Sequence, residues 1–125
     1  MNNPARILIV DDNAANREIL IKRLQPQGYE FLQAADGEEA LAIATRSIPD
    51  LILLDVGMPG LDGPRTFALL KSFDPGVPCY FMSGDCYPYT RQGLLEMGAR
   101  DLLEKPFVMV SLPDILHEFR LEPVQ

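Results

Sequence analysis

Two four-residue stretches of this chain are apolar at every position, and aspartate follows each of them at once. Ile7–Val10 precedes Asp11 and Asp12, and Leu51–Leu54 precedes Asp55. A strand with one face in water alternates apolar and polar residues, whereas a strand covered on both faces is apolar throughout. The two runs therefore predict strands of a parallel sheet that is covered on both faces.

The rest of the chain alternates between short apolar runs and stretches of helical period. Strand and helix alternate five times, and right-handed crossovers in such a chain give a doubly wound α/β fold. We expect one five-stranded parallel sheet with helices on both faces. The expected strands are Arg6–Val10, Tyr29–Gln33 as an edge strand, Leu51–Leu54, Val77–Met82 and Asp101–Leu103.

The helices are predicted from apolar stripes and from residues that start or stop a helix. In the first helix Ile19, Leu20 and Leu24 form the stripe, and Pro26 and Gly28 end it. The others are expected at the stripe of Ala40, Leu41 and Ala44, with Asp36 as N-cap and Glu39 as its capping-box partner, and over Pro64–Phe73, Thr90–Met97 and Val108–Arg120.

Length and charge restrict the function classes. A chain of 125 residues suits one hydrophobic core, so we expect a single domain over residues 1–125. The N-terminus has no apolar leader, and every apolar run is far shorter than the roughly 20 residues of a membrane helix, so a cytoplasmic location without membrane contact is expected. A net charge of −7 disfavours direct binding of nucleic acid. Cys79 and Cys86 match neither a disulfide framework nor a zinc motif, and Cys79 is expected in the core.

Charged and polar residues recur where the predicted strands end. Asp11 and Asp12 follow the first strand, Asp55 the third, Ser83 the fourth and Lys105 the fifth. Ligand sites in open parallel sheets lie beyond the carboxyl ends of the strands, so this joint placement predicts one site. Each feature alone has a simpler explanation, because aspartates often cap helices and the other residues are common in turns.

Three carboxylates in one crevice repel one another, and at pH 7 they take up a proton or bind a cation. A site of oxygen ligands favours a hard ion such as Mg²⁺ over zinc or copper, and Mg²⁺ commonly binds carboxylates together with phosphate oxygens. A nearby lysine supplies positive charge for an incoming phosphoryl group, and a serine hydroxyl can hydrogen-bond it. The cluster therefore indicates Mg²⁺-dependent phosphoryl chemistry.

These residues resemble the receiver domain of two-component response regulators, the CheY-like family. The resemblance runs from the strand before Asp11 to the helix after Lys105-Pro106-Phe107, and Gly98–Asp101 is also typical of the family. Its most specific stretch is Asp55–Gly63, which reads Asp-Val-Gly-Met-Pro-Gly-Leu-Asp-Gly. The resemblance implies the strand order 2-1-3-4-5 that is known for this fold.

The resemblance also implies a role for each residue of the site. Asp55 would accept a phosphoryl group from a histidine kinase or a small phosphodonor, and the chain would catalyse only its own phosphorylation and dephosphorylation. Phosphorylation would change the surface offered to a downstream effector protein or output domain. The other residues would hold the metal or the phosphoryl group: Asp12 and the backbone carbonyl of Gly57 would bind Mg²⁺ together with Asp55, Asp11 would act indirectly, and Ser83 and Lys105 would contact the phosphoryl group.

One position departs from the family pattern. Many receivers carry a rotating Tyr or Phe three residues before the lysine, whereas this chain has Leu102. We hypothesise that Tyr87 or Tyr89 forms part of the switching or docking surface instead; packing of both rings over the edge of the sheet is the competing interpretation. The resemblance further implies a cis bond between Lys105 and Pro106.

Three other functions stay open on sequence grounds. A flavodoxin-like electron carrier would place a flavin phosphate beside Asp11 and Asp12, which repel it. A phosphotransferase or phosphatase of the haloacid dehalogenase type carries a second aspartate where this chain has Gly57. A receiver-fold docking module that works without phosphorylation agrees with Leu102 but leaves the acidic cluster without a purpose.

Overall fold

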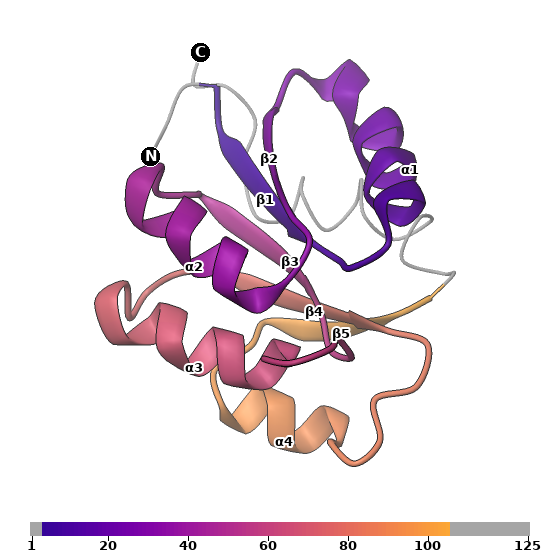
Figure 1. Ribbon diagram of the computed structural model, residues 1–125, viewed down its shortest axis with the longest axis vertical. Helices are drawn as coiled ribbons and strands as arrows, with labels where there is room; N and C mark the ends of the chain where they lie inside the picture. Colours follow the sequence, from indigo (N-terminus) through magenta and orange to yellow (C-terminus); the bar gives the residue numbers. More distant parts are fainter. Residues whose placement is uncertain (1–3, 106–125) are drawn as a thin grey trace.

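The computed structural model describes residues 4–105. The predicted elements appear close to their expected bounds, whereas the helix expected over Val108–Arg120 lies outside the described residues. Figure 1 labels the strands and the α-helices. They are β1 (Arg6–Val10), α1 (Ala14–Leu24), the short 3-10 helix η1 (Gln25–Gln27), β2 (Glu30–Ala34), α2 (Gly37–Arg46), β3 (Leu51–Asp55), α3 (Gly63–Phe73), β4 (Cys79–Ser83), α4 (Arg91–Glu96) and β5 (Asp101–Glu104).

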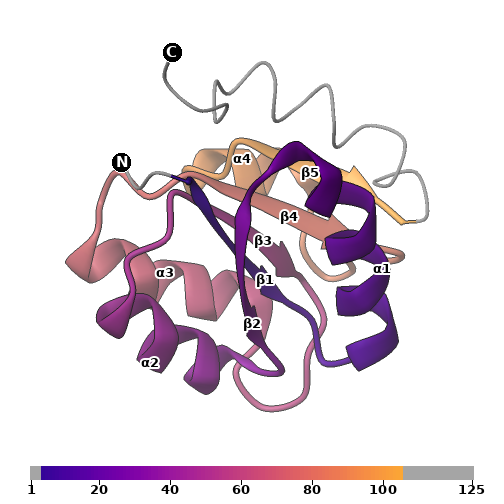
Figure 2. The same cartoon turned by 90° about the horizontal axis from the view of Figure 1, so that it is seen from above.

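Each face of the sheet has its own hydrophobic core. Helix α1 covers one face, and α2, α3 and α4 cover the other (Figures 1 and 2). On the α1 side Ile7 and Ile9 pack with Leu20, and on the opposite side Leu8 packs with Phe67. All side chains of β1 from Ile7 onward and of Leu51–Leu54 in β3 are fully buried, because successive residues point to alternate cores. The expectation of strands covered on both faces is confirmed.

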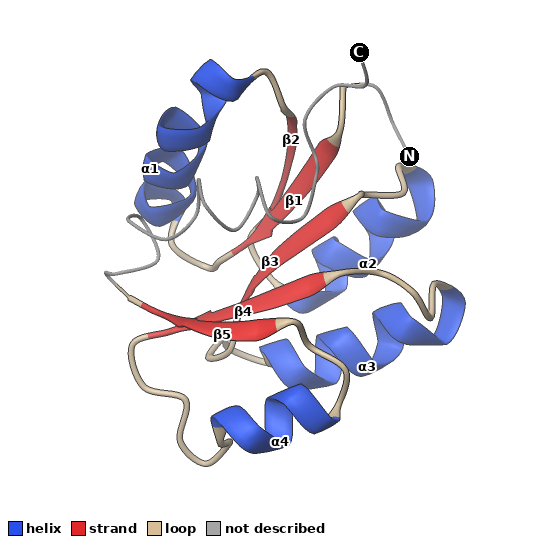
Figure 3. Cartoon of the chain, turned by 180° about the vertical axis from the view of Figure 1, so that it is seen from behind, coloured by secondary structure: helices blue, strands red, loops and turns tan. Residues whose placement is uncertain are grey.

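The strands lie side by side in the order β2-β1-β3-β4-β5, and all of them are parallel (Figure 3). This confirms the doubly wound α/β fold and the strand order 2-1-3-4-5. Strand β2 is an edge strand, as expected, although it begins one residue later than predicted. Because the strands are parallel, their carboxyl ends meet at one edge of the sheet.

Helix α1 corrects one prediction. Leu20 and Leu24 are buried, but Ile19 is 52% exposed and does not belong to the apolar stripe. Each residue turns an α-helix by about 100°, and Ile19 lies on the side of Leu20 that faces away from Leu24. Ile21, on the other side, packs partly against the core. The predicted stop is confirmed, since Gly28 caps the C-terminus of η1 with φ of 85°.

Side-chain caps begin the helices on the other face. Asp36 accepts a hydrogen bond from the backbone N–H of Glu39 at 2.7 Å, as predicted. The Glu39 carboxylate accepts a hydrogen bond from the backbone N–H of Ala35 at 2.6 Å. In a standard capping box the donor is the N–H of the N-cap residue itself, which here is Asp36. The later helices use the same device: Asp62 caps α3 and Thr90 caps α4.

Two further features bear on where a ligand can bind. An apolar cavity of about 470 Å³ lies between α2 and α3, near the segments that follow the C-terminus of each helix. Ile48, Phe73 and Val77 form part of its wall. None of the predicted site residues lines this cavity. Among residues 4–105, no helix has the length and apolar character needed to cross a membrane.

Replacing Leu20 with alanine should destabilise the protein far more than the same change at its neighbour Ile19. Leu20 is 3% exposed and Ile19 is 52% exposed. Truncating a buried leucine costs about 2–5 kcal/mol, whereas surface changes stay within about 0.5 kcal/mol. Urea unfolding of Leu20→Ala and Ile19→Ala, followed by circular dichroism, measures both losses. Equal losses would contradict the orientation of α1.

Candidate functional site

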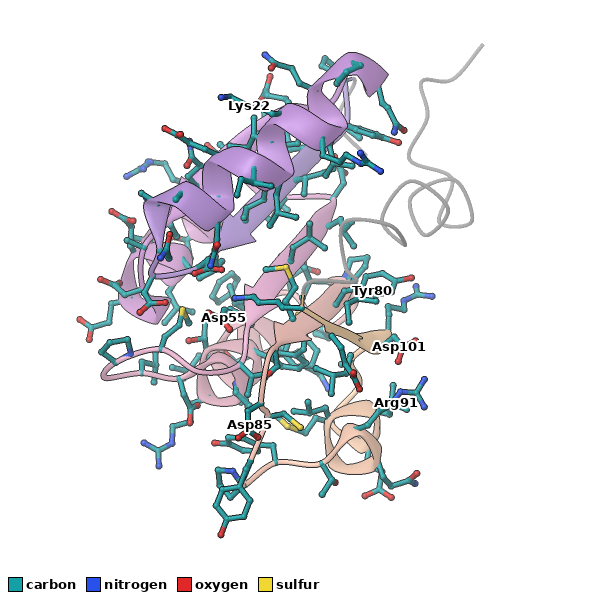
Figure 4. All side chains as sticks on the ribbon, turned by 90° about the vertical axis from the view of Figure 1, so that its right-hand side faces the viewer. Lys22, Asp55, Tyr80, Asp85, Arg91 and Asp101 are labelled. Atoms are coloured by element: carbon teal, nitrogen blue, oxygen red, sulfur yellow. The ribbon has the colours of Figure 1, made fainter. Side chains whose placement is uncertain are left out.

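The three predicted carboxylates meet at the carboxyl edge of the sheet. Asp11 directly follows β1, and Asp55 is the last residue of β3 rather than the first residue after it. Asp12 comes from the loop that leads into α1. Each of the three residues offers a carboxylate oxygen, and these oxygens lie within 4.8 Å of one another. In Figure 4, Asp55 lies at the end of the sheet from which the loop carrying Asp85 leaves.

The strand register explains this convergence. Val10 of β1 is level with Leu54 of β3, which places the next residues, Asp11 and Asp55, side by side. Asp55 is in turn level with Met82 of β4. The register also aligns the last two strands. Ser83 ends β4 opposite Glu104 of β5, and Lys105 is the next residue after Glu104.

Lys105 joins the carboxylates of two strands. Its Nζ donates a hydrogen bond to Oδ2 of Asp11 at 3.0 Å and lies 3.4 Å from Oδ2 of Asp55. Its backbone N–H donates to the carbonyl of Ser83 at 2.9 Å, which holds the lysine against the end of β4. Burial lowers the pKa of Lys105, but the hydrogen bond to Asp11 and the charge of Asp55 outweigh it and leave the pKa above its usual value. The lysine therefore stays charged.

Burial perturbs the carboxyl group of Asp55. Its residue is 7% exposed, and burial raises its pKa from 3.8 to about 6. The positive charge of Lys105 lowers the pKa, the negative charge of Asp11 raises it, and the backbone N–H of Gly57 lowers it slightly by hydrogen bonding. One lysine does not fully compensate the buried carboxylates, so the site favours a further positive charge.

Asp11 is fully buried and held from several sides. Its Oδ1 accepts a hydrogen bond from the backbone N–H of Asn13 at 2.9 Å, and its Oδ2 accepts one from Nδ2 of Asn16 at 3.4 Å. The guanidinium of Arg17 donates to the backbone carbonyl of Asp11 at 2.6 Å. Sequence reasoning missed Asn16 and Arg17, although both stand on the first turns of the helix that follows the acids.

The simpler explanation of Asp-Asp-Asn is right for its third residue only. Asn13 caps α1, accepting a hydrogen bond from the backbone N–H of Asn16 at 3.1 Å. Asp12 is exposed, with its carboxylate beside those of Asp11 and Asp55. Helix capping and an acidic cluster therefore coexist in one tripeptide.

Two glycines shape the loop that follows Asp55. A Cβ on Gly63 would lie 2.2 Å from the backbone oxygen of Asp55, so only glycine lets α3 begin this close to β3. Gly57 is exposed, and a Cβ there would meet nothing within 4 Å. The entrance to the site is thus open beside Gly57 and tightly packed at Gly63.

The remaining predicted residues are placed as follows. Ser83 is buried at the end of β4, and Leu102 packs partly against the core beneath α2, α3 and α4. Cys79 is in the core, as expected, and burial raises the pKa of its thiol. The Lys105–Pro106 bond lies outside the described residues.

Comparison with known proteins agrees with this geometry. A family model for the response regulator receiver domain matches residues 7–117. The transcriptional regulatory protein PrrA of Mycobacterium tuberculosis is 41% identical over 107 residues, which are 86% of this chain and 46% of PrrA. The chain therefore spans about half the length of this curated relative.

Solved structures show the same fold. Chemotaxis protein CheY4 of Vibrio cholerae is 33% identical with a TM-score of 0.83, covering 91% of this chain and 97% of CheY4. CheY in a CheX–CheY–BeF3–Mg²⁺ complex from Borrelia burgdorferi is 25% identical with a TM-score of 0.84, covering 92% of this chain and 89% of that one.

The family match covers most of the chain, and PrrA exceeds 30% identity over a similar span. The sheet order and the three clustered aspartates agree with the same assignment. The chain belongs to the response regulator receiver domain family of two-component signalling.

Proposed function

We propose that Asp55 is the phosphoacceptor of this receiver domain and that its phosphorylation depends on Mg²⁺. The observation that carries the proposal is the convergence of three carboxylates with Lys105, whose Nζ lies within 3.4 Å of both Asp11 and Asp55. A buried nucleophile, a fixed cation and an excess of negative oxygens are the parts that phosphoryl transfer to a carboxylate requires.

The donor set fits Mg²⁺. In this proposal Asp12, Asp55 and the backbone carbonyl of Gly57 bind the ion, and Asp11 acts indirectly by orienting its neighbours. All of these ligands are hard oxygen atoms, and the carboxylate oxygens of Asp11, Asp12 and Asp55 lie close enough together, within 4.8 Å, for one ion. When bound, Mg²⁺ neutralises charge on the carboxylates and on the phosphoryl oxygens. The related CheY from Borrelia burgdorferi, solved with BeF3 and Mg²⁺, supports this choice.

The protein's own residues would perform the transfer. A carboxylate oxygen of Asp55 attacks phosphorus, while the bond from phosphorus to the donor breaks and the donor leaves with the electron pair. Attack requires the ionised carboxylate, and Lys105 favours that form by lowering the pKa of Asp55. Lys105 then pairs with the phosphoryl oxygens, and the Ser83 hydroxyl donates a hydrogen bond to one of them.

The wider role follows from the family. We propose that residues 1–125 form one receiver domain that catalyses only its own phosphorylation and dephosphorylation. A sensor histidine kinase or a phosphotransfer protein supplies the phosphoryl group, and an effector protein or an output domain responds. The chain spans about half of its curated relatives, such as PrrA at 46% and MprA at 47% of their lengths. The net charge of −7 argues against direct nucleic-acid binding, and a cytoplasmic location stays a prediction.

Incubation with acetyl phosphate should add a single phosphoryl group to the protein. The adduct should require Mg²⁺ and be absent from Asp55→Asn, because the amide is not a nucleophile of comparable strength. Intact mass spectrometry with and without Mg²⁺ measures this directly. Absence of any adduct in the wild type would refute the proposal and favour the docking module that works without phosphorylation.

The free energy of unfolding of the metal-free protein should reveal the raised pKa of Asp55. The pKa is about 6 in the folded state against 3.8 for the unperturbed group, so folding favours the protonated form. This contribution is complete below about pH 4 and is lost as the pH rises through about 6. Asp55→Asn has no such loss. Between about pH 4 and pH 7 the free energy of unfolding of Asp55→Asn should therefore rise relative to that of the wild type, by on the order of 2–3 kcal/mol.

Urea unfolding at the two pH values measures this difference, with Asp85→Asn as the control because Asp85 is exposed. The control should show no comparable gain. Adding Mg²⁺ at the higher pH should narrow the gap, since an ion that binds the folded wild type stabilises it. A difference between Asp55→Asn and wild type that ignores both pH and Mg²⁺ would contradict the electrostatic account.

A further inference from the structure

Two loops that leave the sheet beside the site are joined by one side-chain hydrogen bond. The hydroxyl of Tyr89, on the loop between β4 and α4, donates to Oδ2 of Asp62 at 2.7 Å. Asp62 stands at the end of the loop between β3 and α3. One loop starts after Ser83 and the other after Asp55, so this hydrogen bond connects the segments that follow two of the proposed site residues.

The two carboxylate oxygens of Asp62 have different partners. Its Oδ1 accepts a hydrogen bond from the backbone N–H of Arg65 at 3.0 Å and thereby caps α3. Its backbone carbonyl accepts from the hydroxyl of Thr66 at 2.7 Å. Oδ2 is left for Tyr89. A displacement of the Tyr89 hydroxyl therefore acts on the carboxylate that caps the first turn of α3.

Tyr89 is firmly placed in its own loop. Its backbone N–H donates to the carbonyl of Cys86 at 2.7 Å, and the Cys86 thiol lies 3.2 Å from the carbonyl of Tyr89. The ring is partly buried against the core beneath α2, α3 and α4. The next residue, Thr90, caps α4. The tyrosine thus stands between the end of β4 and the start of α4.

The two tyrosines of the loop differ in a way that separates their roles. Tyr87 is 86% exposed, and its backbone N–H donates a hydrogen bond to Oδ1 of Asp85 at 3.0 Å. The hydrogen bond to Asp62 is the main cause that raises the pKa of Tyr89, and burial is the second. The Tyr89 hydroxyl therefore remains a proton donor at neutral pH. Of the pair, Tyr89 has the geometry for internal coupling.

We propose that Tyr89 is a positioning residue for the first turn of α3, and that its hydrogen bond to Asp62 transmits the response of the segment after Ser83 to that turn. The proposal rests on the proposed function of Asp55. It supplies a route that does not need an aromatic side chain at position 102, where this chain has Leu102. The transmitted change would reach the α3 end of the site as well as α4.

Tyr89→Phe tests the proposal, because it removes the hydroxyl and keeps the ring that packs on the core. Tyr87→Phe is the matched control. Amide chemical shifts of Arg65 and Thr66 are followed by NMR before and after addition of acetyl phosphate with Mg²⁺, and intact mass spectrometry of the same samples measures the adduct. We expect the adduct in all three proteins and a shift of both amides in wild type and Tyr87→Phe.

The switched arrangement of α3 is the one that gives these shifts of the Arg65 and Thr66 amides. In Tyr89→Phe its population should fall roughly tenfold, because one hydrogen bond to a charged group is lost. Asp62→Ser keeps a helix cap but lacks the second oxygen, so it should lose the same response. The double variant Tyr89→Phe with Asp62→Ser should lose no more of the α3 response than either single variant. If each change had only a structural effect, the two losses would add.

The outcomes are distinguishable. If the wild type forms no adduct, the proposed function fails and this inference fails with it. If all variants form the adduct and Tyr89→Phe shifts Arg65 and Thr66 as fully as Tyr87→Phe, the positioning role is wrong while the phosphoacceptor role stands. If the losses in Tyr89→Phe and Asp62→Ser add in the double variant, the hydrogen bond is not the route of coupling.

Discussion

Incomplete charge compensation at the carboxyl edge of the sheet is the constraint on which this site depends. Asp11 is fully buried and Asp55 nearly so, and Lys105 is the cation placed between them. One ammonium group cannot balance two buried carboxylates and the exposed Asp12 beside them. Burial raises the pKa of Asp55 even though Lys105 lowers it, so the charged form of this carboxyl group is incompletely stabilised. In the proposed function, the same excess attracts a hard cation and, with that cation, a phosphoryl group.

The fold delivers these charges through register. Ile7–Val10 in β1 and Leu51–Leu54 in β3 are apolar and fully buried, and at the carboxyl ends of these runs Asp11 and Asp55 lie level with each other. Gly63 lets α3 start against the backbone of Asp55, and the Tyr89 hydroxyl reaches Asp62 from the neighbouring loop. Rigid strands fix the acids, and short loops that contact each other surround them. Small movements near Ser83 therefore have a defined neighbour on which to act.

Sequence periodicity predicted the sheet because Ile7–Val10 and Leu51–Leu54 leave few other environments for a run of apolar residues. It predicted the site because parallel strands bring their carboxyl ends together, while the strand order came from the family resemblance. It placed Ile19 wrongly, since three apolar residues near one another do not reveal which of them faces away from the sheet. It also could not find the partners of Asp11 and Asp62. Arg17 and Tyr89 reach these aspartates through loop and helix geometry that no local pattern encodes.

Burial raises the pKa of the Asp55 carboxyl group to about 6, and a divalent cation bound beside it should lower that pKa by stabilising the charged form. The most direct measurement is an NMR titration of the Asp55 side-chain carboxyl carbon in the metal-free protein and again with saturating Mg²⁺. We predict a midpoint near 6 without metal, in line with the raised pKa, and a clearly lower midpoint with Mg²⁺. A midpoint at the ordinary value for aspartate, unchanged by Mg²⁺, would contradict the account.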